Sequence, residues 1–317
     1  MNKCLYCYQP IELEGVDFHP NCSKKIFGHP CPPLLPYSES DLEPLAREVI
    51  QSHTAVTGVQ AKLSLHITGN ETNKERSRFT IVGLWGGYIL KPPTIWYPQL
   101  PEVEDLTMHL AELVKIKTAP HSLVRLASGN LAYITKRVDR TRDRKLAMED
   151  MCQLTERLTE DKYQGSYEQI ARTIMKYSAI PGLDVVNFFE LVLFSFVTGN
   201  ADMHLKNFSL LDQSGLGMAL SPAYDLVNTA LVNPADKEEL ALNLNGKKNK
   251  IKKADFIEAM NRLNIDQKQQ QHMFNKIQKA HPKWIDLIDE SFLTTEFKEQ
   301  YKVIVNNRLN RIFIDEE

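Results

Sequence analysis

The chain has 317 residues, 43% hydrophobic and 25% charged, which suits a globular protein with two domains or one two-lobed domain. Its 38 lysines and arginines against 40 aspartates and glutamates give a net charge of −2, which excludes a strongly basic chain drawn to nucleic acid. No signal sequence opens the chain, and no apolar run reaches the roughly 20 residues that a membrane span needs. We therefore expect a cytoplasmic protein, without membrane contact and with reduced thiols.

Residues 1–35 are rich in cysteine, histidine and proline and are predicted to form a separate head. Four of the five cysteines lie in the first 31 residues, and their odd total does not suit a disulfide framework. The possible ligands form two close pairs joined by eleven residues: Cys4 with Cys7, and His19 with Cys22. Three sulfurs and one nitrogen suit a structural, tetrahedral Zn²⁺ site, with Cys31 as a spare ligand. The alternative is a knob of buried, reduced cysteines.

Residues 36–140 are predicted to form a small β-rich N-lobe that contains the nucleotide loop. A helix is expected at residues 38–50, capped by Ser38 or Ser40. Apolar–polar alternation or a short apolar run predicts strands at residues 62–67, 78–82, 88–91 and 131–136. One helix, at residues 104–116, interrupts these strands, and its apolar face is formed by Leu106, Leu110 and Leu113.

Residues 141–317 are predicted to form a larger helical C-lobe. Helical periodicity recurs at residues 148–158, 166–177, 183–197, 253–263, 266–279 and 295–314. A short strand is expected at residues 208–211. The sequence therefore predicts an α+β, bilobal fold like that of protein kinases, in which a small β-rich lobe precedes a larger helical one.

The candidate catalytic loop follows the apolar helix at residues 183–197. Asp202 and Asn207 stand five positions apart, which is the spacing of a phosphoryl-transfer loop. There the aspartate accepts the proton of an attacking hydroxyl and the asparagine ligates Mg²⁺, for which Asp225 would supply a second ligand. Between them, His204 either braces the loop or transfers protons. Lys206 either faces the γ-phosphate or is solvated.

Groups that bind phosphate are expected in the β-rich lobe. A turn with one glycine offers backbone N–H groups and an ammonium ahead of the first long strand: Thr57, Gly58, Val59, Gln60, Ala61 and Lys62. Lys91 ends an apolar strand and Glu104 opens the next helix, so the two are expected to form a kinase-type lysine–glutamate pair. Glu102 is a competing partner. An ordinary surface ion pair is the alternative.

These segments resemble the HipA-type serine/threonine kinase toxins of bacterial toxin–antitoxin systems, over residues 38–315. The matching motifs are residues 57–62, 88–92, 135–140 with 148–153, and 200–209 with 223–225. The resemblance implies a HipA-like fold, ATP and Mg²⁺ as cofactors, and phosphorylation of a protein, with aminoacyl-tRNA synthetases as the characteristic targets. It also implies a helix-turn-helix antitoxin, through which the kinase would reach DNA only indirectly.

The resemblance also assigns roles to individual positions. It makes residues 57–62 the nucleotide loop, Lys91 the phosphate lysine and Asp202 the catalytic residue. It makes Asn207 and Asp225 the magnesium ligands. The remaining residues expected near the nucleotide are the adenine-side hinge and four residues of the C-lobe: Lys136, Arg137 and Val138, with Asp202, His204, Tyr224 and Asp225.

Two departures from the family pattern affect this expectation. The chain starts almost at the kinase core, which resembles the short HipT-type toxins, in which a separate small companion protein replaces an N-terminal subdomain. Their target is tryptophanyl-tRNA synthetase, and glutamyl-tRNA synthetase is the other candidate. The family also autophosphorylates serines ahead of the nucleotide loop. Because position 55 is alanine here, Thr57 and then Thr54 are the expected sites.

Other classes of function stay open from the sequence. A small-molecule phosphotransferase would use the same catalytic loop. An inactive kinase scaffold, or a binding module such as a zinc-headed nucleic-acid binder, is the alternative outside the enzymes. The complete set of Lys91, Glu104, Asp202, Asn207 and Asp225 disfavours a scaffold, and the net charge of −2 disfavours direct nucleic-acid binding.

Overall fold

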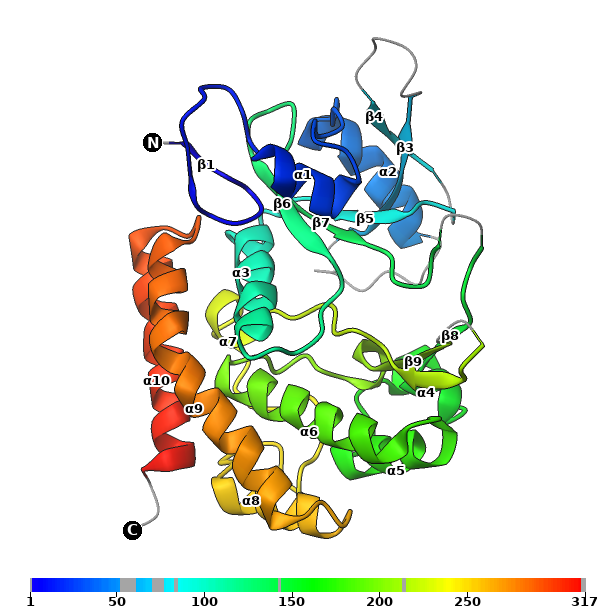
Figure 1. The fold of residues 1–317 in the computed structure, drawn as a ribbon, viewed down its shortest axis with the longest axis vertical. Helices are drawn as coiled ribbons and strands as arrows, with labels where there is room; N and C mark the ends of the chain where they lie inside the picture. Colours follow the sequence, from blue (N-terminus) through cyan, green and yellow to red (C-terminus); the bar gives the residue numbers. More distant parts are fainter. Residues whose placement is uncertain are drawn as a thin grey trace. The chain divides into compact units, whose positions relative to one another are not determined.

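The computed structural model describes residues 2–51, 61–69, 77–82, 85–141, 144–212 and 215–314. By their contacts the residues group into two units (Figure 1). Unit 1 consists of Met1–Asp105, Ala119–Arg137 and Glu290–Phe292. Unit 2 consists of Leu106–Thr118, Val138–Asp289 and Leu293–Glu317. Thr54 and residues 57–60 of the predicted nucleotide loop lie outside the described residues.

Unit 1 is centred on a five-stranded antiparallel sheet of order β4-β3-β5-β7-β6. Its strands are β3 (Leu63–Thr68), β4 (Arg78–Ile81), β5 (Tyr88–Lys91), β6 (His121–Arg125) and β7 (Leu131–Lys136). Alternation along β3 buries Leu63 and Leu65 while His66 faces solvent. The four predicted strands are confirmed. β6 was not foreseen because its first four residues are all buried, so the strand does not alternate.

The N-terminal head packs on this sheet within unit 1. It consists of β1 (Asn2–Lys3), β2 (Pro10–Ile11) and α1 (Pro20–Phe27), and α2 (Glu39–Gln51) follows it. The backbone N–H of Leu123 donates to the carbonyl of Leu5 at 3.3 Å, so the head covers the β6 edge of the sheet. Phe27 packs edge-on against Phe79 with ring centroids 5.7 Å apart. The head therefore shares the hydrophobic core of the sheet.

Helix α3 (Leu100–Leu113) begins earlier than residue 104, where the sequence predicted it. Gln99 has a left-handed φ of 55°, and the N–H of Val103 donates to its carbonyl at 2.9 Å, which closes the first turn. Leu106 and Leu110 are fully buried as expected. Leu113 is 37% exposed, so its place on the apolar face was wrong.

Unit 2 contains most of the helices and a three-stranded sheet of order β10-β9-β8. The strands are β8 (Met148–Asp150), β9 (Ser209–Asp212) and β10 (Met218–Leu220). The helices are α4 (Met151–Leu154), η1 (Thr159–Asp161), α5 (Tyr167–Tyr177), α6 (Pro181–Val197), η2 (Leu205–Asn207), α7 (Thr229–Val232), α8 (Lys253–Asn261), α9 (Gln267–Glu290) and α10 (Thr295–Phe313). The sequence predicted α5, α6, α8, α9 and α10, although α9 runs further than expected, past Pro282.

Helix α6 leads into the candidate catalytic loop and is the central helix of unit 2. Every residue from 188 to 197 is buried, including the polar side chain of Glu190. That carboxylate is offset by the ammonium of Lys276 on α9, 2.6 Å away, as a buried charge requires. Because residues 188–197 are buried on all sides of the helix, this part of the sequence is nearly continuously apolar.

The helix predicted at residues 148–158 is wrong in its first part. Residues 148–150 form strand β8, which pairs with β9 in an antiparallel register. Asp150 then caps the short helix α4, since its Oδ1 accepts from the N–H of Gln153 at 3.0 Å. The partner strand lies about sixty positions away in sequence, so local periodicity carries no trace of it.

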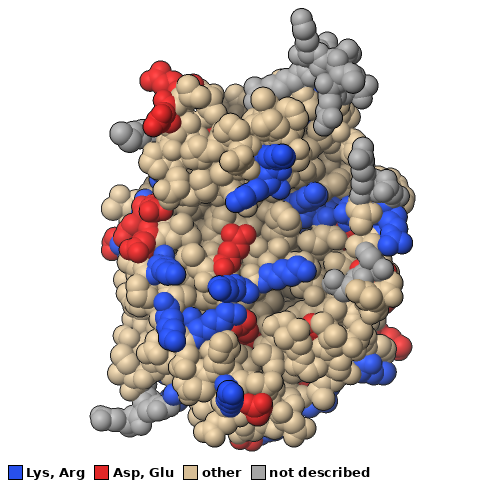
Figure 2. All heavy atoms as spheres, viewed as in Figure 1, with Lys and Arg blue, Asp and Glu red and all other residues tan. Residues whose placement is uncertain are grey.

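The described residues form a mixed helix and sheet structure, which confirms the α+β class. Among the helices of the described part of the chain, none combines the length and the apolar character that a bilayer crossing requires. Basic and acidic side chains both appear on the face shown in Figure 2, in keeping with the net charge of −2.

Candidate active site

The candidate catalytic loop begins where α6 ends, at a position that only glycine fits. Gly199 has a φ of 73°, and an added Cβ would lie 2.7 Å from Oδ1 of Asn228. The next residues are fixed by hydrogen bonds: the N–H of Ala201 donates to Oγ1 of Thr229 at 2.7 Å. The N–H of Asp202 donates to Oδ1 of Asn200 at 3.1 Å. The loop is therefore held in place ahead of Asp202.

Asp202 and Asn207 are joined directly. The Nδ2 of Asn207 donates to the backbone carbonyl of Asp202 at 2.8 Å. Its backbone N–H donates to the carbonyl of His204 at 3.0 Å, within the single turn of η2. Because the amide N–H group is used for this bond, the amide oxygen is the atom that Asn207 can offer to a cation. The five-residue spacing thus forms one closed turn.

Tyr163 contacts the candidate catalytic loop, and this residue was not identified from the sequence. Its hydroxyl donates to Oδ1 of Asp202 at 2.6 Å, and its ring meets the His204 ring edge-on, with centroids 5.0 Å apart. Burial lowers the pKa of His204, and the Asp202 and Asp225 carboxylates partly oppose that shift. His204 is therefore a neutral, buried ring at pH 7. Both carboxylates lie close enough to act on it.

Asp225 is held in an unusual backbone conformation. Its φ is 60°, in the left-handed region that non-glycine residues seldom occupy. The preceding residues are anchored: the N–H of Ala223 donates to the carbonyl of Lys117 at 2.7 Å. The Tyr224 hydroxyl donates to the carbonyl of Lys206 at 3.1 Å. These bonds fix the direction in which the Asp225 side chain leaves the backbone, at the expense of local strain.

Lys206 has a protein partner in the structure. Its Nζ lies 2.7 Å from Oδ2 of Asp150, the carboxylate that also caps α4, and its side chain is 36% exposed. The sequence predicted that Lys206 faces the γ-phosphate or is solvated, and neither prediction included an ion pair with Asp150. Asp150 was part of a family motif at residues 148–153 but was not selected as a site residue.

The lysine–glutamate pair lies inside unit 1. The Nζ of Lys91, at the end of β5, is 2.5 Å from Oε1 of Glu104 on α3, and both side chains are buried. The Lys91 ammonium also lies over the Tyr133 ring, 5.3 Å from its centroid. Burial raises the pKa of the competing Glu102 to about 7, with a smaller contribution from Asp105. The pair is buried, unlike the surface pair considered as the alternative.

The other nucleotide-binding candidates are only partly placed. Of the predicted loop, Ala61 is half-buried and Lys62 is exposed, immediately before β3. Lys136 ends β7, where its N–H donates to the carbonyl of Pro120 at 2.8 Å. The N–H of Arg137 donates to the carbonyl of Gly87 at 2.9 Å. The chain passes from unit 1 to unit 2 between Arg137 and Val138.

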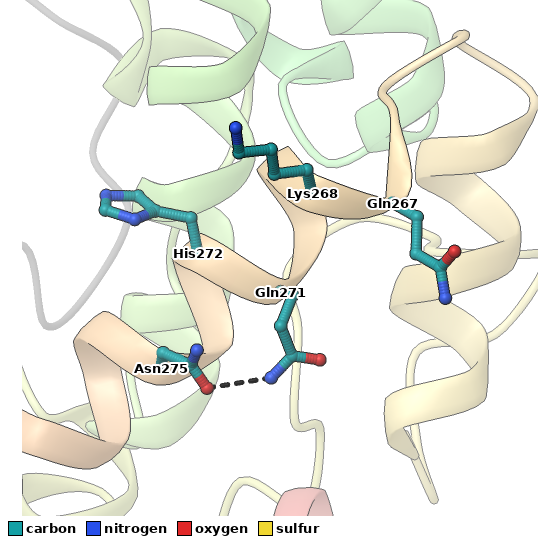
Figure 3. Close-up of a pocket in the computed structure, with 5 residues that line it drawn as sticks. All are labelled: Gln267, Lys268, Gln271, His272 and Asn275. Carbon is teal, nitrogen blue, oxygen red and sulfur yellow. Dashed lines mark hydrogen bonds between the residues drawn. The ribbon is translucent and has the colours of Figure 1, made fainter.

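Two further features of the described residues lie outside the catalytic loop. The four candidate zinc ligands, Cys4, Cys7, His19 and Cys22, come together in the head of unit 1. A shallow pocket on α9 is lined by five polar side chains: Gln267, Lys268, Gln271, His272 and Asn275 (Figure 3). All five belong to one helix, four of them are exposed, and Gln271 donates to Asn275 at 2.7 Å. The pocket shares no residue with the loop, and its side chains suggest no chemistry.

Comparison with known proteins finds relatives that are named as candidate kinases. Two Sinorhizobium fredii proteins named as candidate kinases, Y4mE and Y4dM, are 32% and 33% identical over 189 residues. These matches cover 56% and 55% of this chain, and the chain spans only 41% and 45% of the length of those relatives. A Haemophilus influenzae protein, also named as a candidate kinase, is 28% identical over 250 residues, covering 73% of this chain and 69% of its own.

Two solved structures share the fold. A chain of the Shewanella oneidensis MR-1 complex of HipA, HipB and operator DNA matches 84% of this chain and 70% of its own, with a TM-score of 0.67 and 22% identity. The Helicobacter pylori proinflammatory kinase CtkA matches 78% of this chain and 93% of its own, with a TM-score of 0.54 and 16% identity. The predicted kinase-like, HipA-like fold is thereby confirmed. A model of the HipA-like C-terminal domain matches residues 54–285, and the chain therefore belongs to this family.

Proposed function

We propose that this protein is an ATP- and Mg²⁺-dependent serine/threonine protein kinase in which Asp202 accepts the proton of the substrate hydroxyl. The observation that carries the proposal is the closed turn from Asp202 to Asn207, made by a 2.8 Å hydrogen bond. Tyr163 holds the Asp202 carboxylate at 2.6 Å. Membership of the HipA-like family and the candidate-kinase names of the relatives support this assignment.

The residues of the loop suit a magnesium ion. The amide oxygen of Asn207 and the carboxylate of Asp225 are hard oxygen donors, which Mg²⁺ prefers. The strained backbone of Asp225 supports a ligand role, because such strain persists where a side chain must be aimed. When bound, Mg²⁺ would neutralise charge on the leaving diphosphate. The proposed phosphate-binding role of Lys91 rests on its pairing with Glu104.

The reaction follows from these roles. The oxygen of a serine or threonine hydroxyl attacks the γ-phosphorus of ATP, the bond from that phosphorus to the bridging oxygen breaks, and ADP leaves. The hydroxyl proton passes to Asp202, whose other contacts keep its carboxylate in place. A buried, neutral His204 packs against Tyr163 and braces the loop, which makes it a positioning residue in this scheme.

The kinase is proposed to act as a growth-inhibiting toxin of a toxin–antitoxin pair. The Shewanella structure contains HipA with HipB and operator DNA, which supports a helix-turn-helix antitoxin as partner and DNA binding through that antitoxin only. An aminoacyl-tRNA synthetase, tryptophanyl or glutamyl, is the proposed substrate. A small companion protein is a further proposed partner.

Labelled ATP tests the activity. Incubation of the purified protein with γ-labelled ATP, Mg²⁺ and cell lysate is expected to label a protein band, and the two purified synthetases are then tried singly. Asp202→Asn is expected to lower the rate by about 100-fold or more, since a positioned base contributes about 10²–10⁴. His272→Ala, on the exposed face of α9, is the matched control. A labelled metabolite with no labelled protein would point instead to a small-molecule phosphotransferase.

Growth arrest separates the enzyme from a scaffold. Expression of the wild-type chain is expected to stop growth, and Asp202→Asn is expected to relieve that arrest. If Asp202→Asn arrests growth as strongly as the wild type while accumulating to the same level, the protein acts by binding and the kinase proposal is wrong.

Self-inactivation is proposed at Thr57, with Thr54 as the second choice. A phosphate there adds close to two negative charges beside the nucleotide phosphates. Mass spectrometry of the wild type is expected to find that modification, and the Asp202→Asn protein is expected to lack it. An unmodified loop in active wild-type protein would contradict the proposal.

A further inference from the structure

The N-terminal head brings two pairs of metal-binding side chains to one point. Cys4 and Cys7 flank the turn between β1 and β2, where the N–H of Tyr8 donates to the carbonyl of Cys4 at 2.9 Å. His19 is the N-cap residue of α1, and Cys22 lies in the first turn of that helix. The donor atoms of all four residues lie within 4.8 Å of one another. Fifteen positions of sequence separate Cys7 from Cys22, so only the fold of the head makes this cluster.

The spacing of the donor atoms is that of a tetrahedral zinc site. Zinc bonds of about 2.3 Å to sulfur and about 2.0 Å to nitrogen give tetrahedron edges of about 3.8 Å between sulfurs and about 3.5 Å between sulfur and nitrogen. In the structure, Sγ of Cys7 lies 3.5 Å from Nδ1 of His19. Sγ of Cys22 lies 3.9 Å from the same nitrogen. The two distances from Nδ1 of His19 to sulfur therefore match the expected edges within about 0.4 Å, and the remaining donor pairs lie within 4.8 Å.

The second ring nitrogen of His19 supports the same assignment. Its Nε2 lies 3.0 Å from the backbone carbonyl of Pro10, to which a protonated Nε2 donates. In the tautomer with its N–H at Nε2, the ring has the lone pair of Nδ1 directed at the cysteines, as in zinc sites where the other ring N–H is held by a carbonyl. Nδ1 is the atom that faces both Sγ atoms, so ring orientation and tautomer agree.

The donor set excludes the other common explanations of clustered cysteines. All three thiols are free. A disulfide between any two of them would not account for the third thiol and the imidazole that lie beside it. Thiolates do not suit Mg²⁺ or Ca²⁺, which take oxygen ligands. Cys31 is exposed and stands outside the cluster among the described residues, so it is not a ligand.

We propose that Cys4, Cys7, His19 and Cys22 bind one structural Zn²⁺ that fixes the head of unit 1. Four protein donors fill the tetrahedral shell, so the metal has no open position for a substrate or a water molecule. The metal would add to the packing of the head on the sheet, because the head by itself is small. Two strands of 2 residues and a helix of 8 residues are too small to bury a core of their own.

The zinc site would also position the helix that carries Glu104. Tyr8 follows the ligand Cys7 directly, is 1% exposed and has a left-handed φ of 62°. Its hydroxyl donates to Oδ2 of Asp105 at 2.7 Å, inside unit 1. Asp105 is the neighbour of Glu104, whose carboxylate holds Lys91. Metal binding at Cys7 therefore fixes a tyrosine that anchors the first part of α3. Only this last consequence rests on the proposed kinase function.

Metal content of the purified full-length protein tests the site. Protein produced in medium with added zinc is expected to contain about one Zn²⁺ per chain by elemental analysis, and under about 0.2 equivalents would overturn the proposal. Cys7→Ser and Cys22→Ser are expected to lose most of the metal. Cys31→Ser and Cys152→Ser are the matched controls, because both cysteines lie outside the cluster, and each is expected to keep its full equivalent.

A second measurement needs no variant and so survives a failure of the variants to fold. Wild-type protein produced with cobalt in place of zinc is expected to show the intense visible bands of tetrahedral Co²⁺ together with sulfur-to-metal charge transfer. The weak bands of octahedral cobalt would contradict the proposal. Asp202→Asn is expected to retain its zinc, so loss of kinase activity and loss of metal are separate outcomes.

Discussion

The hydroxyl of Tyr163 donates a 2.6 Å hydrogen bond to the carboxylate of Asp202. Burial raises the pKa of Tyr163, and the Asp202 charge raises it further, so the phenol stays protonated and remains a donor at any ordinary pH. Asp202 is thus fixed at two places: at its backbone N–H by Asn200 and at its side chain by Tyr163. We interpret Tyr163 as the residue that sets the orientation of the Asp202 carboxylate, the proposed catalytic base.

Tyr163→Phe is expected to lower kcat about tenfold while leaving the KM for ATP unchanged. The ring and its packing on His204 remain, so only the hydrogen bond to Asp202 is lost, and orientation of the base affects the chemical step. Steady-state kinetics at several ATP concentrations measures both constants. Tyr177→Phe is the control, because that exposed tyrosine is in the same unit. A large rise in the KM for ATP with an unchanged kcat would show that Tyr163 binds nucleotide instead.

Removing one member of the buried Lys91–Glu104 pair is expected to lower the free energy of unfolding much more than replacing both members with apolar residues. Glu104→Gln or Lys91→Met alone leaves one charged group buried without its partner, which destabilises by about 3–5 kcal/mol. The double variant Lys91→Met with Glu104→Leu is expected to recover most of that stability. It should not recover ATP binding, because the ammonium is gone. Chemical denaturation and nucleotide titration separate these two effects.

The partly exposed pair of Lys248 and Glu238 is the control for the buried pair. Its side chains are 25% and 44% exposed, so Lys248→Met is expected to cost less than about 1 kcal/mol. If Lys91→Met costs no more than Lys248→Met, the Lys91–Glu104 pair contributes no more than an ordinary surface ion pair and the prediction is wrong.

Glu102 is expected to make the protein less stable as pH rises. Burial raises the pKa of this carboxyl from 4.5 to about 7 in the folded protein. Below pH 4.5 the group is protonated in both states and has no effect. As pH rises toward 7, Glu102 ionises in the unfolded chain but stays largely protonated in the folded protein, so the free energy of unfolding falls. Above pH 7 the carboxyl is ionised in both states and the loss of stability is complete. Glu102→Gln is therefore expected to be the more stable protein at about pH 8, by about 3 kcal/mol, since each pKa unit corresponds to about 1.4 kcal/mol.

Urea unfolding at about pH 4 and about pH 8 measures this effect. The two proteins should have equal stability at the lower pH and differ at the higher one. Glu160→Gln, at an exposed carboxylate, is the matched control and should show no such difference. An equal gain for Glu102→Gln at both pH values would mean that packing, and not ionisation, is responsible.

Asp225→Asn is expected to weaken Mg²⁺ binding without loss of stability. Asparagine tolerates the left-handed backbone at this position, so the free energy of unfolding should change by less than about 0.5 kcal/mol. The loss of a ligand charge should raise the Mg²⁺ concentration for half-maximal activity more than about tenfold. Asp225→Ala should show the same metal defect plus about 1 kcal/mol of lost stability from backbone strain.

Asp236→Asn is the control for the magnesium prediction, since that exposed aspartate lies in the same unit. Magnesium titrations of both variants at saturating ATP give the comparison. An unchanged magnesium requirement in Asp225→Asn would remove Asp225 from the metal site and leave its strain unexplained.

Parts of the site could be found in the sequence because they are local. Asp202 and Asn207 could be selected from their spacing alone because they lie on one turn, and the hydrogen bond that joins them was added by the structure. Lys91 and Glu104 were predicted as a pair, with Glu102 as a competing partner, and the structure pairs Lys91 with Glu104. Residues two positions apart on a helix point in nearly opposite directions, so Glu102 and Glu104 cannot both face Lys91. Because α3 starts at Leu100 instead of residue 104, the sequence did not show which side of the helix faces Lys91.

The amino-acid sequence by itself determined the elements whose cause is local: the alternating strands of unit 1, the apolar helix α6, and the turn from Asp202 to Asn207. Tertiary structure alone decided which distant side chains meet them. Tyr163 lies 39 positions from Asp202, Asp150 lies 56 positions from Lys206, and β8 became a strand only because β9 was there to pair with it. Such contacts depend on how buried surfaces fit together, and that fit leaves no periodic pattern along the chain.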